Sequence, residues 1–292
     1  MTDWQRIADD IGETTGEPFV AETPRSLGGG CINTAVKLCD GARCYFVKIN
    51  DATRIAMFEA ERDGLAEMAS AQAVRVPRAV LTGSDGRESW IVMEYVAMGR
   101  PASGSQVEAG RQLAAMHRQV ADAFGWHRDN TIGSTPQVND WIDDWIGFWR
   151  VHRLGFQLEL AASHGHGGRL TDLGNRVLEA LPALLVHGPE PSLLHGDLWG
   201  GNIGYDGDGH PVLFDPAVYF GDREADLAMT ELFGGFSGDF YAAYNDVWPI
   251  DPGYKVRKTL YNLYHILNHL NLFGGGYAGQ ATGMMERILV EI

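Results

Sequence analysis

The stretch Leu193–Gly204, LLHGDLWGGNIG, points most directly to the fold of this chain. An apolar segment leads into a His-Gly-Asp turn that ends at Asp197, and Asn202 lies five residues further on. A second apolar run, Pro211–Phe214, ends at Asp215, eighteen residues after Asp197. Phosphoryl transfer from a nucleotide needs a carboxylate at the attacking hydroxyl, and an amide oxygen with another carboxylate to hold Mg²⁺. The order and spacing therefore predict the catalytic loop and the metal loop of a kinase.

Length and composition place the chain among ordinary globular proteins. Its 292 residues, 45% hydrophobic and 21% charged, can bury the core of one large domain or of two lobes. The formal net charge of −15 argues against nucleic acid or an anionic membrane surface as the main partner. The sequence has neither an apolar run of membrane-spanning length nor a basic and then apolar leader. We therefore expect a soluble, cytoplasmic protein.

Three cysteines, Cys31, Cys39 and Cys44, lie within one short stretch. An odd number without a regular framework predicts reduced thiols, which are typical of the cytoplasm. No cysteine and histidine cluster has the spacing of a four-ligand zinc site, so we expect no zinc.

The apolar pattern changes along the chain from strand-like to helical. The first part predicts a helix in residues 1–17, a helix Arg54–Ser70 and strands Pro24–Gly30, Ile32–Leu38, Arg43–Ile49, Ala79–Thr82 and Trp90–Val96, with a two-residue hairpin turn at Asp40-Gly41. The rest predicts helices Ser105–Ala121, Val138–Ala162, Leu170–Leu185, Glu224–Phe233, Phe240–Trp248, Tyr254–Phe273 and Thr282–Ile292. We expect an α+β fold of two lobes. Residues 1–96 form a small antiparallel-sheet lobe that binds the nucleotide, and residues 97–292 form a large, mainly helical lobe for catalysis and substrate binding.

The nucleotide phosphates are expected to bind in the first lobe. Gly28, Gly29 and Gly30 stand between two strands, where glycines let backbone N–H groups approach a phosphate, although most such triplets are flexible turns. Lys48 follows the triplet by eighteen residues, on the strand where a kinase places its phosphate-binding lysine; a solvated surface charge is the alternative. Glu61 is favoured over Glu59 as its partner, because apolar residues three before and four after Glu61 share its helix face.

Other residues complete the set expected to bind the nucleotide. Cys31 directly follows the glycines, and Asn33 lies two residues after Cys31. The end of the last strand would meet the adenine through backbone groups, an inference from position alone that covers Met93, Glu94, Tyr95 and Val96.

Asp197 is expected to act as the general base that accepts the proton of the substrate hydroxyl, the alternative being an aspartate that caps a tight turn. Asn202 and Asp215 are expected to bind Mg²⁺, which prefers oxygen ligands.

Three residues near the loop are expected to support it rather than to react. His195 would brace the loop, and one of Asp222 and Asp226 would be a structural carboxylate beneath it, with Arg223 paired nearby.

Four segments together resemble the fructosamine kinase family, whose members are ketosamine-3-kinases. They are HGDLWGGN, FDPAVYFGDREADLA, GGGCIN before FVKIN, and GWHRDNTIGSTPQVNDWIDDW; the last, within Phe124–Trp145, is the most specific together with Trp199. The resemblance covers nearly the whole chain. It implies a protein-kinase-like fold related to aminoglycoside kinases.

The resemblance also implies ATP-dependent phosphorylation, with Mg²⁺, of O3 in ketosamines such as adducts of fructose or ribulose with lysine, either free or on glycated proteins. Phosphorylation makes the adduct fall off, which is a deglycation repair. Two alternatives stay open: a related kinase for an aminoglycoside, an amino alcohol or a sugar, and a nucleotide-binding pseudokinase sensor. The retained Lys48, Asp197, Asn202 and Asp215 argue against the second.

The substrate is expected to contact aromatic side chains. Trp199 stands two residues from Asp197, and His269, late in the last long helix, is a second candidate, with a core histidine as the alternative. The stripe Trp141, Trp145, Phe148 and Trp149 is interpreted as helix core in preference to a substrate wall.

Cys31 supports a further hypothesis. N–H groups of a phosphate-binding loop lower the pKa of a thiol, so oxidation of Cys31 would switch activity off, and the chain would be a monomer or a redox-dependent homodimer. An ordinary loop cysteine is the alternative. An oxidant response that persists in Cys31→Ser would exclude the hypothesis.

Overall fold

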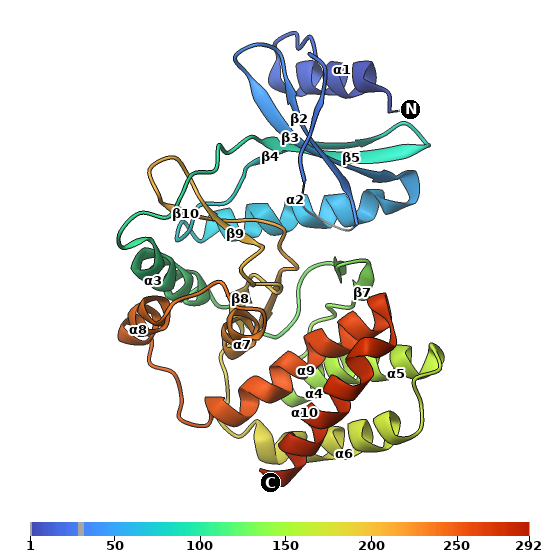
Figure 1. Ribbon diagram of the computed structural model, residues 1–292, viewed down its shortest axis with the longest axis vertical. Helices are drawn as coiled ribbons and strands as arrows, with labels where there is room; N and C mark the ends of the chain where they lie inside the picture. Colours follow the sequence, from blue (N-terminus) through green and yellow to red (C-terminus); the bar gives the residue numbers. More distant parts are fainter. Residues whose placement is uncertain (1, 29–31, 292) are drawn as a thin grey trace. The chain divides into compact units, whose positions relative to one another are not determined.

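The computed structural model describes residues 2–28 and 32–291 (Figure 1). The chain divides into two compact units. The first comprises the described residues up to Ser105 together with Gly204–Pro216, and the second comprises Gln106–Ile203 and the described residues from Ala217 onward. This division differs from the predicted lobes in residues 97–105 and 204–216. Backbone hydrogen bonds explain the difference, because Gly99 N donates to Tyr205 O at 2.7 Å and Leu213 N donates to Arg75 O at 3.0 Å.

The first unit is built on an antiparallel five-stranded sheet with the strand order β1-β2-β3-β5-β4. Its elements are α1 (Trp4–Thr15), β1 (Arg25–Ser26), β2 (Thr34–Cys39), β3 (Cys44–Asp51), η1 (Ala52–Arg54), α2 (Ile55–Ser70), β4 (Ala79–Ser84) and β5 (Glu88–Glu94), with the short hairpin β9 (Ile203–Tyr205) and β10 (Pro211–Leu213). The small antiparallel sheet expected from the sequence is confirmed, although the predicted strand Pro24–Gly30 contributes only Arg25 and Ser26.

Helices cover both faces of this sheet, with α1 on one side and α2 on the other (Figure 1). Successive strand residues point to opposite faces, so Trp90 and Val92 of β5 pack in the cluster with α1, whereas Ile91 and Met93 pack against α2. The α1 helix is well capped: the Asp3 side chain accepts the N–H of Arg6, and Gly16 ends the helix with a φ of 76°.

Cys39 and Cys44 form a disulfide, so the prediction of three reduced thiols is wrong for this pair. The two residues face each other at the end of the β2–β3 ladder, with their Cα atoms 4.2 Å apart. Directly opposite residues of an antiparallel pair come this close where they do not exchange backbone hydrogen bonds. The intervening turn has four residues, closed by Asp40 N donating to Arg43 O at 3.0 Å, so the predicted two-residue turn is also wrong. These cysteines no longer support a cytoplasmic location.

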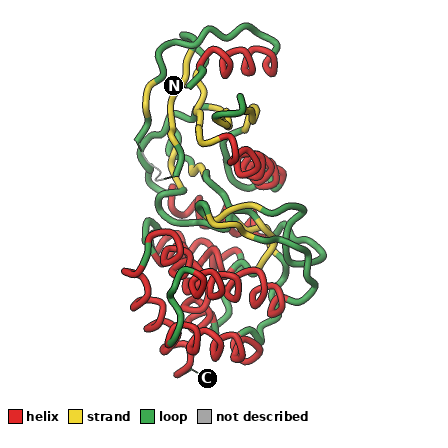
Figure 2. The backbone as a smooth tube through the Cα atoms, turned by 90° about the vertical axis from the view of Figure 1, so that its right-hand side faces the viewer, coloured by secondary structure: helices red, strands yellow, loops and turns green. Residues whose placement is uncertain are grey.

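The second unit is mainly helical (Figure 2). Its helices are α3 (Ser105–His117), α4 (Trp145–Phe148), η2 (Trp149–Gly155), α5 (Phe156–Ser163), α6 (Arg169–Leu184), α7 (Glu224–Leu232), α8 (Gly238–Val247), α9 (Tyr254–Phe273), η3 (Gly275–Tyr277) and α10 (Ala278–Val290). Two short antiparallel pairs accompany them, β6 (Asn130–Ile132) with β7 (Thr135–Gln137), and β8 (Ser192–Leu194) with β11 (Tyr219–Gly221).

The predicted helix Val138–Ala162 is wrong in its first part. Helical structure begins at Trp145, because Asp144 caps the helix by accepting the N–H of Gly147, and the η2 segment within it is a π-helix. Trp145, Phe148 and Trp149 are buried and pack on one another, which confirms their interpretation as core. Trp141 precedes the helix and is 47% exposed, so the interpretation as helix core is wrong for this residue.

Among the described helices, none is both long enough and apolar enough to span a bilayer.

Candidate active site

Lys48 lies at the centre of an ion-pair cluster in the first unit. Its Nζ is 2.6 Å from Glu61 Oε1 and 2.6 Å from Asp215 Oδ1. The strand period explains the first contact, since Lys48 shares its face of β3 with Phe46, which packs in the cluster of α2. The structure thus pairs Lys48 with Glu61, the glutamate favoured over Glu59.

Burial separates the two carboxylates of this cluster. The side chains of Lys48 and Glu61 are 7% and 10% exposed, whereas that of Asp215 is 46% exposed. Burial alone would lower the pKa of Lys48, but the negative charges of Glu61 and Asp215 raise the pKa above its ordinary value. Burial raises the pKa of Glu61, and the charge of Lys48 opposes this. The lysine is therefore cationic, and one of its partners remains open to solvent.

Asp215 adopts a left-handed backbone conformation with φ at 58°, which is uncommon for a residue with a side chain. It follows the strand β10 closely, as the sequence pattern predicted. Such conformations concentrate at functional sites, where surrounding structure enforces them.

The remaining residues expected to bind the nucleotide are placed as follows. Gly28 is exposed, and Asn33 accepts the side-chain N–H of Asn50 at 2.7 Å. Gly29, Gly30 and Cys31 lie outside the described residues. Met93 and Glu94 end β5, and Tyr95 and Val96 follow it; Met93 and Val96 are buried, while Glu94 and Tyr95 are half-buried.

The predicted catalytic loop belongs to the second unit and holds Asp197 and Asn202 together. Asn202 Nδ2 donates to Asp197 O at 2.8 Å and to Asp197 Oδ2 at 3.2 Å. These bonds orient the Asn202 amide, so that its Oδ1 is the atom presented as an acceptor. Asn202 is 6% exposed and Asp197 is half-buried.

Asp226 supports this loop from beneath. Its carboxylate accepts the N–H groups of His195 at 2.7 Å and Gly196 at 2.9 Å. Burial alone would raise the pKa of Asp226, but His117, His195 and the Gly196 N–H lower it below the usual range. Of the two carboxylates that the sequence left open, the structure thus places Asp226 under the loop.

Glycine is required at two points of the loop. Gly196 has a φ of 82°, and a Cβ there would lie 2.0 Å from Ala217 O. A Cβ on Gly201 would lie 2.3 Å from the Trp199 ring, so the absence of a side chain lets that ring lie close to the backbone.

His195 braces the turn, because its Nδ1 accepts the N–H of Asp197 at 3.2 Å and its carbonyl accepts the N–H of Ala217 at 2.8 Å.

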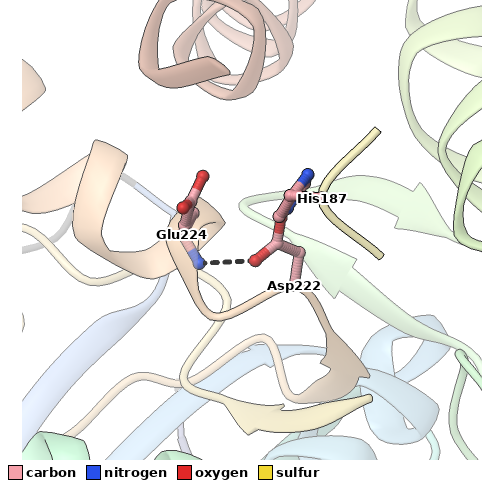
Figure 3. A group of neighbouring side chains, drawn as sticks. All are labelled: His187, Asp222 and Glu224. Carbon is pink, nitrogen blue, oxygen red and sulfur yellow. Dashed lines mark hydrogen bonds and ion pairs between the residues drawn. The ribbon is translucent and has the colours of Figure 1, made fainter. Parts of the chain in front are cut away.

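Asp222 belongs to a different cluster, with His187 and Glu224 (Figure 3). Its Oδ2 lies 2.7 Å from His187 Nε2 and accepts the hydroxyl of Tyr261, and its Oδ1 accepts the Glu224 N–H at 3.0 Å. Arg257 binds both oxygens of Glu224, at 2.6 and 2.9 Å. The carboxylates are thus engaged by donors of the chain, and we interpret the cluster as structural. Arg257 was missed from the sequence, where nothing links it to Glu224.

The two expected substrate residues are joined by a third that sequence reasoning missed. Phe233 lies between them, with its ring centroid 6.2 Å from that of Trp199 and 5.0 Å from that of His269. His269 also contacts Phe273 at 5.5 Å and Tyr277 at 5.2 Å. We call these five residues the aromatic row. Trp199, Phe233 and Phe273 are 39%, 41% and 58% exposed, so the row presents an apolar surface that begins two residues from Asp197.

The segment Phe124–Trp145 supports the backbone that follows Asp215. Within it, Asn130 Nδ2 donates to Val218 O at 2.7 Å, and Gln137 Nε2 donates to Ala217 O at 3.1 Å. These amides are buried. Their amide types were a signal in the sequence, but their targets are backbone carbonyls about 80 residues away along the chain, which no local pattern reveals.

The chain is similar to known proteins over nearly its whole length. The profile of the fructosamine kinase family matches residues 3–291. A Synechocystis protein assigned as a ketoamine kinase is 50% identical over 98% of this chain and 97% of its own length. A chloroplastic protein-ribulosamine 3-kinase of rice is 45% identical over 90% of this chain and 78% of its own.

Solved structures show the same fold. The crystal structure of a Haemophilus somnus protein assigned as a fructosamine-3-kinase matches with a TM-score of 0.90 and 30% identity, over 98% of this chain and 97% of that one. An aminoglycoside phosphotransferase matches with a TM-score of 0.65 and 16% identity, over 97% of this chain and 98% of that one. At that identity the second likeness concerns the fold alone, and it confirms the expected protein-kinase-like class.

Proposed function

The chain belongs to the fructosamine kinase family, and from this premise we propose that it transfers the γ-phosphate of ATP to the 3-hydroxyl of ketosamines. The observation that carries the proposal is the loop in which Asn202 is bonded to Asp197 while Asp226 holds the turn before it. This arrangement offers one carboxylate as a base and one amide oxygen as a ligand, which are the groups that phosphoryl transfer requires.

In the proposed reaction, Asp197 accepts the proton of the substrate hydroxyl as that oxygen attacks the γ-phosphorus. Lys48 binds the phosphates of ATP, and Glu61 keeps its side chain cationic and directed along one face of β3. The glycines that begin at Gly28 are proposed to cover the phosphates, and residues Met93–Val96 to meet the adenine.

The residues present fit a magnesium ion. Asn202 and Asp215 supply oxygen ligands, which Mg²⁺ prefers, and the half-exposed Asp215 carboxylate is accessible to a hydrated ion. We propose that these two residues hold the ion. When bound, Mg²⁺ neutralises charge on the transferring phosphate.

The aromatic row is proposed to bind the ketosamine. A sugar with an apolar or cationic amine on one side is complementary to aromatic faces next to the base. Trp199 and Phe233 lie closest in sequence and space to the loop, and His269, Phe273 and Tyr277 extend the surface. Free ketosamines and glycated proteins are both proposed as substrates, and the resulting activity would be a deglycation repair.

A panel of acceptors tests the function. The purified protein, with ATP and Mg²⁺, is offered ribulose-, erythrulose- and fructose-derived lysine adducts, an aminoglycoside, an amino alcohol and a free sugar, and products are read by mass spectrometry. A gain of one phosphate on ketosamines, absent in Asp197→Asn, is expected. Phosphate gain on another acceptor class with none on ketosamines would instead establish the related small-molecule kinase.

A further inference from the structure

His117, the last residue of α3, is a fully buried histidine that the proposed chemistry does not use. Its Nε2 lies 3.2 Å from Asp226 Oδ2, and its Nδ1 lies 2.8 Å from the Tyr244 hydroxyl. Both neighbours are buried as well. Its two ring nitrogens therefore connect the carboxylate that holds the catalytic loop with a tyrosine of α8.

Which group donates at each contact between Arg223, Tyr244, His117 and Asp226 can be worked out from Arg223. Arg223 can only donate, and its Nη1 is 3.1 Å from the Tyr244 hydroxyl oxygen. The tyrosine oxygen thus accepts from Arg223 and has its own proton available for His117 Nδ1. Burial raises the pKa of Tyr244, so that proton is retained.

This order assigns the protonation of His117. If Nδ1 accepts, the proton of the neutral ring is on Nε2, which then donates to Asp226. A doubly protonated ring would donate to Tyr244 as well, and the tyrosine proton would lose its acceptor inside the core. The neutral ring with its proton on Nε2 leaves each contact with one donor and one acceptor.

With this assignment, the Asp226 carboxylate accepts three hydrogen bonds. Its Oδ2 accepts from His117 and from the N–H of His195, and its Oδ1 accepts from the N–H of Gly196. The two loop donors directly precede Asp197. Rotation of the Asp226 carboxylate would shift both N–H groups and with them the backbone that carries the base.

We propose that His117 and Tyr244 are positioning residues for Asp197, acting through Asp226. The proposal rests on the proposed function, because it takes Asp197 as the base. Apolar side chains would fill the same space without satisfying Asp226, and a buried polar chain with every donor paired specifies a single geometry. A misplacement of about 1 Å in a catalytic group lowers turnover about 100-fold.

Paired variants separate hydrogen bonding from packing. His117→Leu removes the donor to Asp226, whereas His117→Gln keeps both an N–H donor and a carbonyl acceptor. We expect His117→Leu to lower kcat about 10- to 100-fold with KM for ATP and for the ketosamine within about twofold, and His117→Gln to recover most of the loss. Tyr244→Phe should lower kcat less, since Asp226 keeps its direct donors. The matched control is Tyr241→Phe on the same helix, whose hydroxyl contacts Thr230 instead; its kcat should not change.

A kcat for His117→Leu equal to that of the wild type would overturn the proposal, and so would a loss shared equally by His117→Gln. A second measurement does not depend on the folding of variants or on activity. In the ¹⁵N spectrum of the wild type, His117 should carry its ring proton on Nε2, the nitrogen that faces Asp226. A ring proton on Nδ1 instead would overturn the proposal. Absence of phosphoryl transfer in the wild type would count against the proposed function alone.

Discussion

The contribution of the buried ion pair Lys48–Glu61 to the stability of the first unit can be tested quantitatively. In Lys48→Met the ammonium is lost, and the Glu61 carboxylate, 10% exposed, is left without its counter-charge. Breaking a buried ion pair from one side costs about 3–5 kcal/mol, because the remaining charge stays desolvated. We expect the free energy of unfolding to fall by that amount at neutral pH.

The pairing of the two charges predicts strong non-additivity. In Glu61→Gln, Lys48 keeps Asp215 as a partner, so the loss should be smaller, about 1–2 kcal/mol. In Lys48→Met/Glu61→Gln no buried charge is stranded. The cost of Lys48→Met measured in the Glu61→Gln background should therefore fall below about 2 kcal/mol.

Urea unfolding followed by circular dichroism and tryptophan fluorescence measures these energies, and Trp90, which is buried in the sheet of the same unit, reports on its core. Asp215→Asn is the matched control. Its carboxylate is 46% exposed, so loss of its contact with Lys48 should cost under about 1 kcal/mol. The reasoning would be refuted if Lys48→Met cost the same in the wild type and in the Glu61→Gln background.

We expect Asp215→Asn to impair function much more than stability. If Asp215 binds Mg²⁺, the variant should lose turnover and the dependence of nucleotide binding on the metal. Titration of nucleotide binding with Mg²⁺ measures this, and curves identical to those of the wild type would show that the ligand set is wrong.

Three further predictions concern Asp197 and His265 of the second unit and the disulfide between β2 and β3. Asp197→Asn should lower kcat about 10²- to 10⁴-fold while ATP still binds, and near-normal turnover would refute the assignment of the base. Burial, with a smaller contribution from His269, lowers the pKa of His265 to about 3. The unfolded chain takes up this proton near pH 6.5 and the folded one does not, so stability is complete above pH 6.5 and falls by up to about 1.4 kcal/mol per pH unit toward pH 3. The unfolding energies of wild type and His265→Phe at pH 7.5 and 5.5 should show a shallower slope in the variant; equal slopes would contradict this. The disulfide Cys39–Cys44 closes only a short loop, so its reduction should lower the free energy of unfolding by only about 2 kcal/mol. Urea unfolding with and without reductant measures this, and a much larger loss would contradict the prediction.

Patterns with a short range were predictable. The strand period, the helical spacing and the order of Asp197, Asn202 and Asp215 depend on residues close together in the chain, so they indicated the two-part α+β fold and the kinase loop. Predictions were wrong where the same local sequence pattern is compatible with more than one secondary structure. The helix expected from Val138 has a helical spacing of aromatic residues, but the cap at Asp144 begins it later.

The choice among chemically similar side chains required the tertiary structure. Asp222 precedes α7 and Asp226 lies within it, four residues later. Only Asp226 accepts the N–H groups of the loop, whereas Asp222 contacts His187. Cys39 and Cys44 were counted correctly, but their bonding depends on the register of β2 and β3. Phe233 carried no motif that would connect it with Trp199 and His269.

By itself, the amino-acid sequence determined the family, the order of the loops and the residue types available for phosphoryl transfer. These properties follow from spacing along the chain and from side-chain chemistry, both of which are local. Only the tertiary structure decided which of these groups meet: Lys48 with Glu61, Asp226 with the catalytic loop, and His117 between Asp226 and Tyr244. The reason is that packing brings together residues that are from 13 to 127 positions apart in the chain. The distance and burial of each pair then set its charge and its hydrogen bonds.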